Sequence, residues 1–128
     1  ILIMRKLAIF DFDGTLFDSA CDVVICFNKT LEIHNFPTLT FDEYLDRLGV
    51  NIDESVSLIL NDKNTAENIE IVKDTYRKVY AESPKDNTRP FGGVHEVLKA
   101  LQDKGMLLAI NSNRSDDSIG SQIFLMVE

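Results

Sequence analysis

The chain has 128 residues, of which 45% are hydrophobic, and a formal net charge of −8 at pH 7. This length suits one ordinary domain, or a small domain with an insertion, and the apolar content is enough for a core. The acidic charge argues against a nucleic-acid partner or an anionic membrane surface, because either would need a basic face on the protein. No stretch is long enough to cross a membrane, so we expect no membrane partner.

The first predicted element is a short buried strand of a parallel sheet, formed by the apolar residues 7–10 and ended by Asp11. Asp13 follows two residues later and lies on the same side of an extended chain, so both carboxylates can face one small volume. Gly14 then permits a tight turn. Two crowded carboxylates repel each other unless a cation lies between them, and Mg²⁺ accepts carboxylate oxygens. A simple acidic turn is the alternative, because Asp and Gly are common turn residues.

The segment from Asp11 to Ser19 reads DFDGTLFDS and resembles the first motif of the haloacid dehalogenase-like phosphohydrolases. Its form is typical of their phosphoglycolate phosphatase-like branch. The resemblance implies that Asp11 is a nucleophile and Asp13 a general acid and base. It also implies a Mg²⁺ cofactor held by Asp11 and Asp13, and it places Thr15 among the substrate-binding residues. The implied fold class is α/β, a Rossmann-like parallel-sheet core with an inserted helical cap.

The two cysteines, Cys21 and Cys26, lie five residues apart in the next predicted helix and on different faces of it. They form neither a metal-ligand pair nor a disulfide scaffold. We interpret both as small core residues in a reducing compartment and expect a cytoplasmic protein. The N-terminal segment ILIMRKLAIF also lacks the order of a signal peptide.

Residues from about 19 to 83 predict consecutive helices with no strand between them. The helix starts are indicated by polar residues at the spacing of a capping box: Ser19 with Asp22, Thr40 with Glu43, Asn51 with Glu54, and Asn64 with Glu67. A parallel sheet usually returns to its second strand after one crossover helix, so a block of helices suggests an insertion. We expect residues 18–83 to form the cap and residues 1–17 and 84–128 to form a partial core. The hinges are expected at residues 16–18 and 84–90, and the alternative is a helical portion of one core.

A helix from Val94 and a second buried strand over residues 106–110 are predicted next. The strand leads into a polar loop, which by itself could simply cap a final helix through Ser115. The loop also resembles the family's second motif, which implies that Ser112 binds phosphate and that Asn113 orients substrate. Asp116 and Asp117 are interpreted as acidic residues in the first turn of the last helix and not as metal ligands.

The resemblance implies two later motifs, a lysine and an acidic pair, and neither is found in the sequence. We therefore expect a C-terminally truncated member of the family that holds only the first two strands of the core. Such a small sheet would leave an apolar edge and face exposed. Assembly into a homo-oligomer is one way in which the sheet could be restored.

The predicted function is Mg²⁺-dependent hydrolysis of a phosphomonoester through an aspartyl-phosphate intermediate. The expected partner is a small phosphorylated metabolite, such as phosphoglycolate or a sugar phosphate. The alternative is a catalytically incomplete fragment, or a non-catalytic binding or interaction remnant of such a phosphatase. A sugar-phosphate mutase ranks lower, because the first motif of those enzymes more often lacks the Thr-Leu-x-Asp form found here. A dehalogenase ranks lower still, because Asp13 has no clear use without a phosphate ester.

Overall fold

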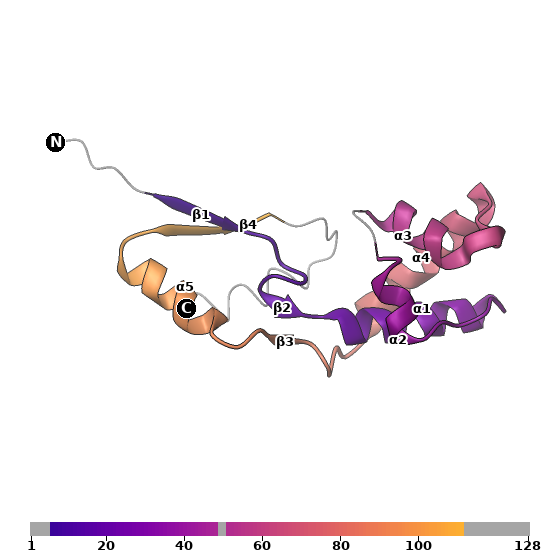
Figure 1. Cartoon of the computed structure of the whole chain (residues 1–128), viewed down its shortest axis with the longest axis horizontal. Coiled ribbons are helices and arrows are strands. Elements are labelled where there is room, and N and C mark those ends of the chain that lie inside the picture. Colours follow the sequence, from indigo (N-terminus) through magenta and orange to yellow (C-terminus); the bar gives the residue numbers. More distant parts are fainter. Residues whose placement is uncertain (1–5, 49–50, 112–128) are drawn as a thin grey trace. The chain divides into compact units, whose positions relative to one another are not determined.

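The computed structural model describes residues 6–48 and 51–111 of the chain. The chain divides into two compact units (Figure 1). The first, which we call the sheet unit, contains residues 1–20 and 88–128, and the second, the helical unit, contains residues 21–87. Helices and strands combine into the α/β class that the sequence predicted.

The sheet unit contains two small sheets. Strands β1 (Leu7–Phe10) and β4 (Leu107–Ile110) pair in parallel, with Leu7 opposite Leu107 and Phe10 opposite Ile110 (Figure 1). Helix α5 (Val94–Asp103) precedes β4. Short strands β2 (Phe17–Asp18) and β3 (Arg89–Pro90) pair antiparallel. These paired residues belong to the two segments predicted as hinges.

The parallel strands are less buried than predicted. Phe10, Leu108 and Ile110 pack against a buried cluster of four residues: Phe12, Leu16, Phe17 and Leu98. On β1, however, the side chains of Leu7 and Ile9 are 54% and 62% exposed, and Leu107 on β4 is 46% exposed. The prediction of fully buried strands is wrong because, in the described part of the chain, one face of β1 has no apolar cover.

The helical unit is built from four α-helices and a short 3₁₀-helix within residues 20–48 and 51–82. In chain order they are α1 (Ala20–Ile33), α2 (Phe41–Leu45), α3 (Ile52–Leu60), the 3₁₀-helix η1 (Asn61–Lys63) and α4 (Ala66–Glu82). No strand interrupts this described segment, as the helical spacing predicted. None of the described helices has both the length and the apolar character needed to cross a membrane.

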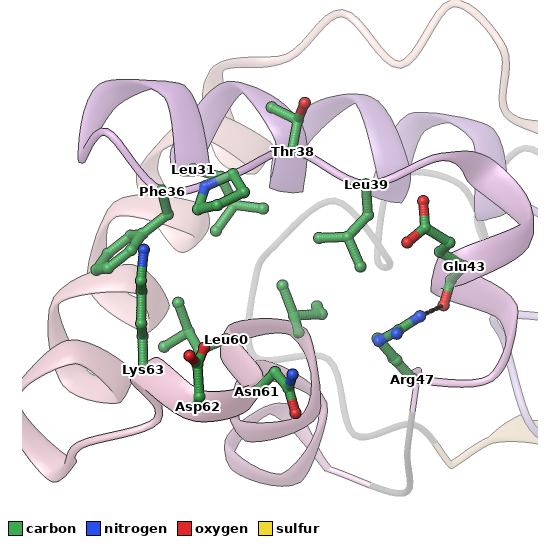
Figure 2. Close-up of a pocket in the computed structure, with 12 residues that line it drawn as sticks. Leu31, Phe36, Thr38, Leu39, Glu43, Arg47, Leu60, Asn61, Asp62 and Lys63 are labelled. Atoms are coloured by element: carbon green, nitrogen blue, oxygen red, sulfur yellow. Dashed lines mark hydrogen bonds between the residues drawn. The ribbon is translucent and has the colours of Figure 1, made fainter.

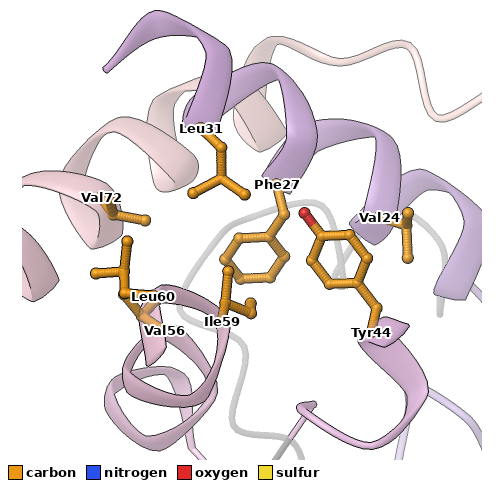
Figure 3. Close-up of a cluster of buried hydrophobic side chains, with 8 residues drawn as sticks. All are labelled: Val24, Phe27, Leu31, Tyr44, Val56, Ile59, Leu60 and Val72. Atoms are coloured by element: carbon orange, nitrogen blue, oxygen red, sulfur yellow. The ribbon is translucent and has the colours of Figure 1, made fainter. Parts of the chain in front are cut away.

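One apolar core joins these helices, and Figure 3 shows its buried side chains converging from all four of them. The ring of Phe27 stacks on that of Tyr76 with 3.8 Å between centroids. Tyr44 is fully buried, and its hydroxyl is satisfied because it donates to Asn28 Oδ1 at 2.5 Å. The core comprises Val24, Phe27, Leu31, Tyr44, Val56, Ile59, Leu60 and Val72.

Side-chain caps fix two of the four predicted helix starts where the sequence placed them. Thr40 and Glu43 form the predicted capping box, and the Asn51 side chain accepts from the Glu54 amide. The start of α4 differs by one residue, because Thr65 and not Asn64 accepts from the amide three positions later. A hydroxyl and an amide both suit an N-cap, so the sequence pattern alone does not choose between neighbours.

The interpretation of both cysteines as core residues is half right. Both are free thiols; Cys26 is buried in α1, whereas Cys21 is exposed on the same helix. Burial raises the pKa of the Cys26 thiol. Positions five apart lie on different faces of a helix, so one core face cannot hold both.

Candidate functional site

The turn after β1 contains two carboxylates on either side of a buried phenylalanine. The Phe12 side chain is 0% exposed and stacks on Phe17 with 4.7 Å between ring centroids. Its neighbours Asp11 and Asp13 are exposed and half-buried, respectively. The buried side chain of Phe12 thus lies between two carboxylates that are more accessible than it is.

Backbone hydrogen bonds hold this turn closed. The Phe12 carbonyl accepts from the amides of Leu16 and Phe17 at 3.0 and 3.1 Å. The Gly14 amide donates to the Phe17 carbonyl at 2.9 Å, and Gly14 has a φ of 76°. Glycine adopts this left-handed conformation more readily than any residue with a Cβ atom, which explains its place directly after Asp13.

Each carboxylate accepts a hydrogen bond inside the motif. Asp11 Oδ1 accepts from the Phe12 amide at 2.8 Å, and Asp13 Oδ1 accepts from the Ser19 hydroxyl at 2.6 Å. Ser19 is only 3% exposed, so this bond is sheltered from water. The sequence placed Ser19 at the end of the motif and predicted a helix cap there, but it did not indicate the contact with Asp13. The one available signal was its position within the same nine-residue motif.

The end of β4 lies next to the end of β1. The Asn111 amide donates to the Phe10 carbonyl at 2.9 Å, which continues the parallel ladder past both strands. Asp11 and Asn111 are therefore the first residues beyond two neighbouring strand ends, where ligands of open α/β sheets bind. The predicted phosphate-binding residues Ser112 and Asn113 lie outside the described residues.

Thr15, the third predicted substrate-binding residue, lies exposed in the same turn. Its amide donates to the Phe12 carbonyl at 3.4 Å. This contact ties the Thr15 backbone to the turn and leaves its side chain on the surface of the sheet unit.

The donor set of the turn suits a hard cation. Asp11 and Asp13 provide carboxylate oxygens, and Mg²⁺ typically takes one or two carboxylates and fills its shell with water and substrate phosphate. Residues 6–48 and 51–111 contain no cluster of three or more His, Cys, Asp or Glu that could hold a metal ion by itself. The two carboxylates of the turn are therefore compatible with Mg²⁺ held together with a phosphate.

The chain is similar in sequence to a known hydrolase family and to several phosphatases. The haloacid dehalogenase-like hydrolase family matches residues 8–126 of the chain. A phosphoglycolate phosphatase of Aquifex aeolicus is 32% identical over 112 residues, which cover 88% of this chain and 51% of that protein. A phosphoglycolate phosphatase of Agrobacterium fabrum is 30% identical, with 88% and 50% covered.

A solved structure of a similarly named protein also resembles this chain in fold. The crystal structure of a predicted phosphoglycolate phosphatase from Haemophilus somnus superimposes with a TM-score of 0.76 at 25% identity, covering 87% of this chain and 52% of that one. The chain thus spans about half the length of the curated relatives it matches. Because the family match extends over nearly all of its residues, the chain belongs to the haloacid dehalogenase-like hydrolases.

Proposed function

We propose that the chain carries the nucleophile and the general acid–base of a phosphomonoester hydrolase. The observation that supports this most is the turn after β1, in which Phe12 is buried while Asp11 is exposed and Asp13 is half-buried. This turn lies inside the segment that matches the hydrolase family. Two similar proteins are named phosphoglycolate phosphatases, so a small phosphorylated metabolite of that kind is the proposed substrate class.

Asp11 attacks the phosphorus atom and forms an aspartyl-phosphate, which divides hydrolysis into two easier steps. Asp13 protonates the leaving oxygen and then takes a proton from the water that attacks the intermediate. The hydrogen bond from Ser19 fixes the carboxylate of Asp13 on its Oδ1 side. Ser112 and Asn113 are proposed to contact the phosphoryl oxygens, and Thr15 is proposed to contact the substrate.

The Asp11 carboxylate and the Asp13 backbone carbonyl are the proposed ligands of Mg²⁺. When bound, Mg²⁺ neutralises the negative charge that develops on the transferring phosphoryl group. We also propose that the helical segment 18–83 is a cap that selects the substrate and excludes water. The cytoplasmic location stays a prediction from the sequence.

The test is Mg²⁺-dependent hydrolysis of an aryl phosphate by the 128-residue chain. Asp11→Asn keeps the size of the side chain but removes the nucleophile, so we expect turnover to fall at least about a thousandfold. Asp103→Asn is the matched control, because Asp103 is an exposed carboxylate on α5 that pairs with Lys99 at 3.6 Å. An active Asp11→Asn variant would overturn the nucleophile assignment.

A catalytically incomplete phosphatase is the second candidate, favoured by the span of only about half of the relatives' length. The same assay separates the two. A folded chain that binds Mg²⁺ and phosphate without turnover would support the incomplete form. A mutase, the lower-ranked alternative, would instead isomerise a sugar phosphate without releasing inorganic phosphate.

A further inference from the structure

Ser19 lies at the junction of two regular elements, because β2 ends at Asp18 and α1 begins at Ala20. The residue is only 3% exposed, and its hydroxyl donates to Asp13 Oδ1 at 2.6 Å. Burial lowers the local dielectric and limits competition from water, so this hydrogen bond is stronger than the same bond at the surface. Ser19 is therefore a well-placed donor beside one of the two carboxylates of the turn.

The carboxylate of Asp13 needs such a restraint to keep one orientation. The closed turn holds the backbone next to it, since the Gly14 amide donates to the Phe17 carbonyl at 2.9 Å. The last torsion of an aspartate side chain is nevertheless broad, so the plane of a carboxylate turns readily unless an oxygen is held. At 2.6 Å, the bond from Ser19 has the length typical of a charge-assisted O–H···O⁻ bond. It thus restrains the plane of the Asp13 carboxylate.

We propose that Ser19 is a positioning residue for proton transfer by Asp13. The inference rests on the proposed function, in which Asp13 protonates the leaving oxygen of a phosphate ester. A general acid must be within hydrogen-bond reach of the atom that it protonates, and a small misalignment lowers the rate steeply. Ser19 acts through Asp13 and makes no contact of its own with the substrate. Its hydroxyl keeps the carboxylate in the orientation that the transfer requires.

A cavity of about 380 Å³ in the helical unit shares no residue with the turn after β1. Its lining contains two carboxylates, Glu43 and Asp62, and two cations, Arg47 and Lys63 (Figure 2). One guanidinium nitrogen of Arg47 also donates to the Glu43 carbonyl. Because these charges balance, the lining has no surplus cation to attract a phosphate ester. Rates measured with phosphate esters therefore report on the turn.

The experiment compares kcat/KM for phenyl phosphate and 4-nitrophenyl phosphate, with Mg²⁺ and the 128-residue chain. Phenolate is the more basic leaving group and depends more on the proton from Asp13. Ser19→Ala should lower kcat/KM about tenfold or more for phenyl phosphate but about threefold or less for 4-nitrophenyl phosphate, because general acid catalysis contributes about 10²–10⁴-fold. A smaller folded fraction lowers both values equally, so their ratio reports positioning and not stability.

Two further variants separate the hydroxyl from the burial of a serine. Ser19→Thr keeps a hydroxyl at this position, so the ratio of the two kcat/KM values should stay within about twofold of that of the unchanged chain. Ser55→Ala is the matched control, because Ser55 is a serine of α3 that is 6% exposed and lies outside the turn. This substitution should leave the ratio unchanged even if it destabilises the chain.

The outcomes distinguish this inference from the function on which it rests. An unchanged ratio in Ser19→Ala, or an equal change in Ser55→Ala, would overturn the role of Ser19 and leave the hydrolase assignment intact. A selective loss with phenyl phosphate that Ser19→Thr restores would support it. Absence of turnover of both esters by the unchanged chain would overturn the proposed function, and the role of Ser19 with it.

Discussion

The two units of this chain differ in how far they bury their apolar side chains. Among its described residues, the helical unit has one core of eight buried residues contributed by four helices. The described part of the sheet unit has a buried cluster of four residues, and its parallel strands expose Leu7, Ile9 and Leu107. Yet the proposed catalytic carboxylates lie in the sheet unit. The comparison shows that the turn forms its own hydrogen bonds even though, within residues 6–48 and 51–111, one face of the sheet has no apolar cover.

The largest expected effect comes from opening the helical core. Phe27→Ala should lower the free energy of unfolding by about 3–5 kcal/mol, because it leaves a cavity beside Tyr76. Ile9→Ala removes an aliphatic side chain that is 62% exposed and should cost about 0.5 kcal/mol or less. Urea unfolding followed by circular dichroism measures both values. Similar losses would contradict the described difference between the units.

The next effect concerns a buried carboxylate that ties the two ends of the helical unit together. Asp22, at the start of α1, accepts from the Asn87 amide at 3.1 Å and from its side-chain nitrogen at 3.2 Å. Asp22→Ala leaves these donors without their acceptor and should cost about 1–3 kcal/mol. It should also speed hydrogen exchange at the Asn87 amide.

The matched control for this carboxylate is Asp86→Ala, which removes an exposed carboxylate beside Asn87. We expect this change to leave both the urea midpoint and the Asn87 exchange rate close to those of the unchanged chain. Equal effects of the two substitutions would show that the contact between Asp22 and Asn87 contributes nothing specific.

The smallest effect is a pH dependence at the exposed capping box. The hydrogen bonds from Thr40 lower the pKa of Glu43 below its ordinary value of 4.5. The stabilisation by ionised Glu43 is thus fully present above pH 4.5 and is lost as the pH falls through the lowered pKa. The Tm difference between the chain and Glu43→Gln should therefore shrink toward about pH 3. A difference that stays constant from pH 7 to about pH 3 would argue against this charge effect.

Local patterns predicted much of the fold. The spacing of apolar residues predicted α1 and α4, and the residue types at Thr40 and Asn51 predicted how α2 and α3 begin. These features depend on contacts within a few residues, which a sequence displays directly. The cap of α4 was displaced by one position because Asn64 and Thr65 are chemically similar choices.

Contacts across the chain were not predictable in the same way. The bond between Asp22 and Asn87 joins residues 65 positions apart, and no spacing rule indicates it. The exposure of Ile9 also depends on what covers the strand and not on its own apolar character. At the candidate site, the placement of Asp11 and Asp13 beside the strand end followed from alternation, whereas the contact of Ser19 with Asp13 required the folded turn.

The central claim is that Asp11 becomes phosphorylated. The most direct measurement is to incubate the chain with Mg²⁺ and acetyl phosphate, trap any acyl phosphate with hydroxylamine, and map the modified residue by mass spectrometry. We predict modification of Asp11 and its absence in Asp11→Asn, with Asp13 unmodified. Modification at another carboxylate, or none in a folded chain that binds Mg²⁺, would contradict the assignment of Asp11 as the nucleophile.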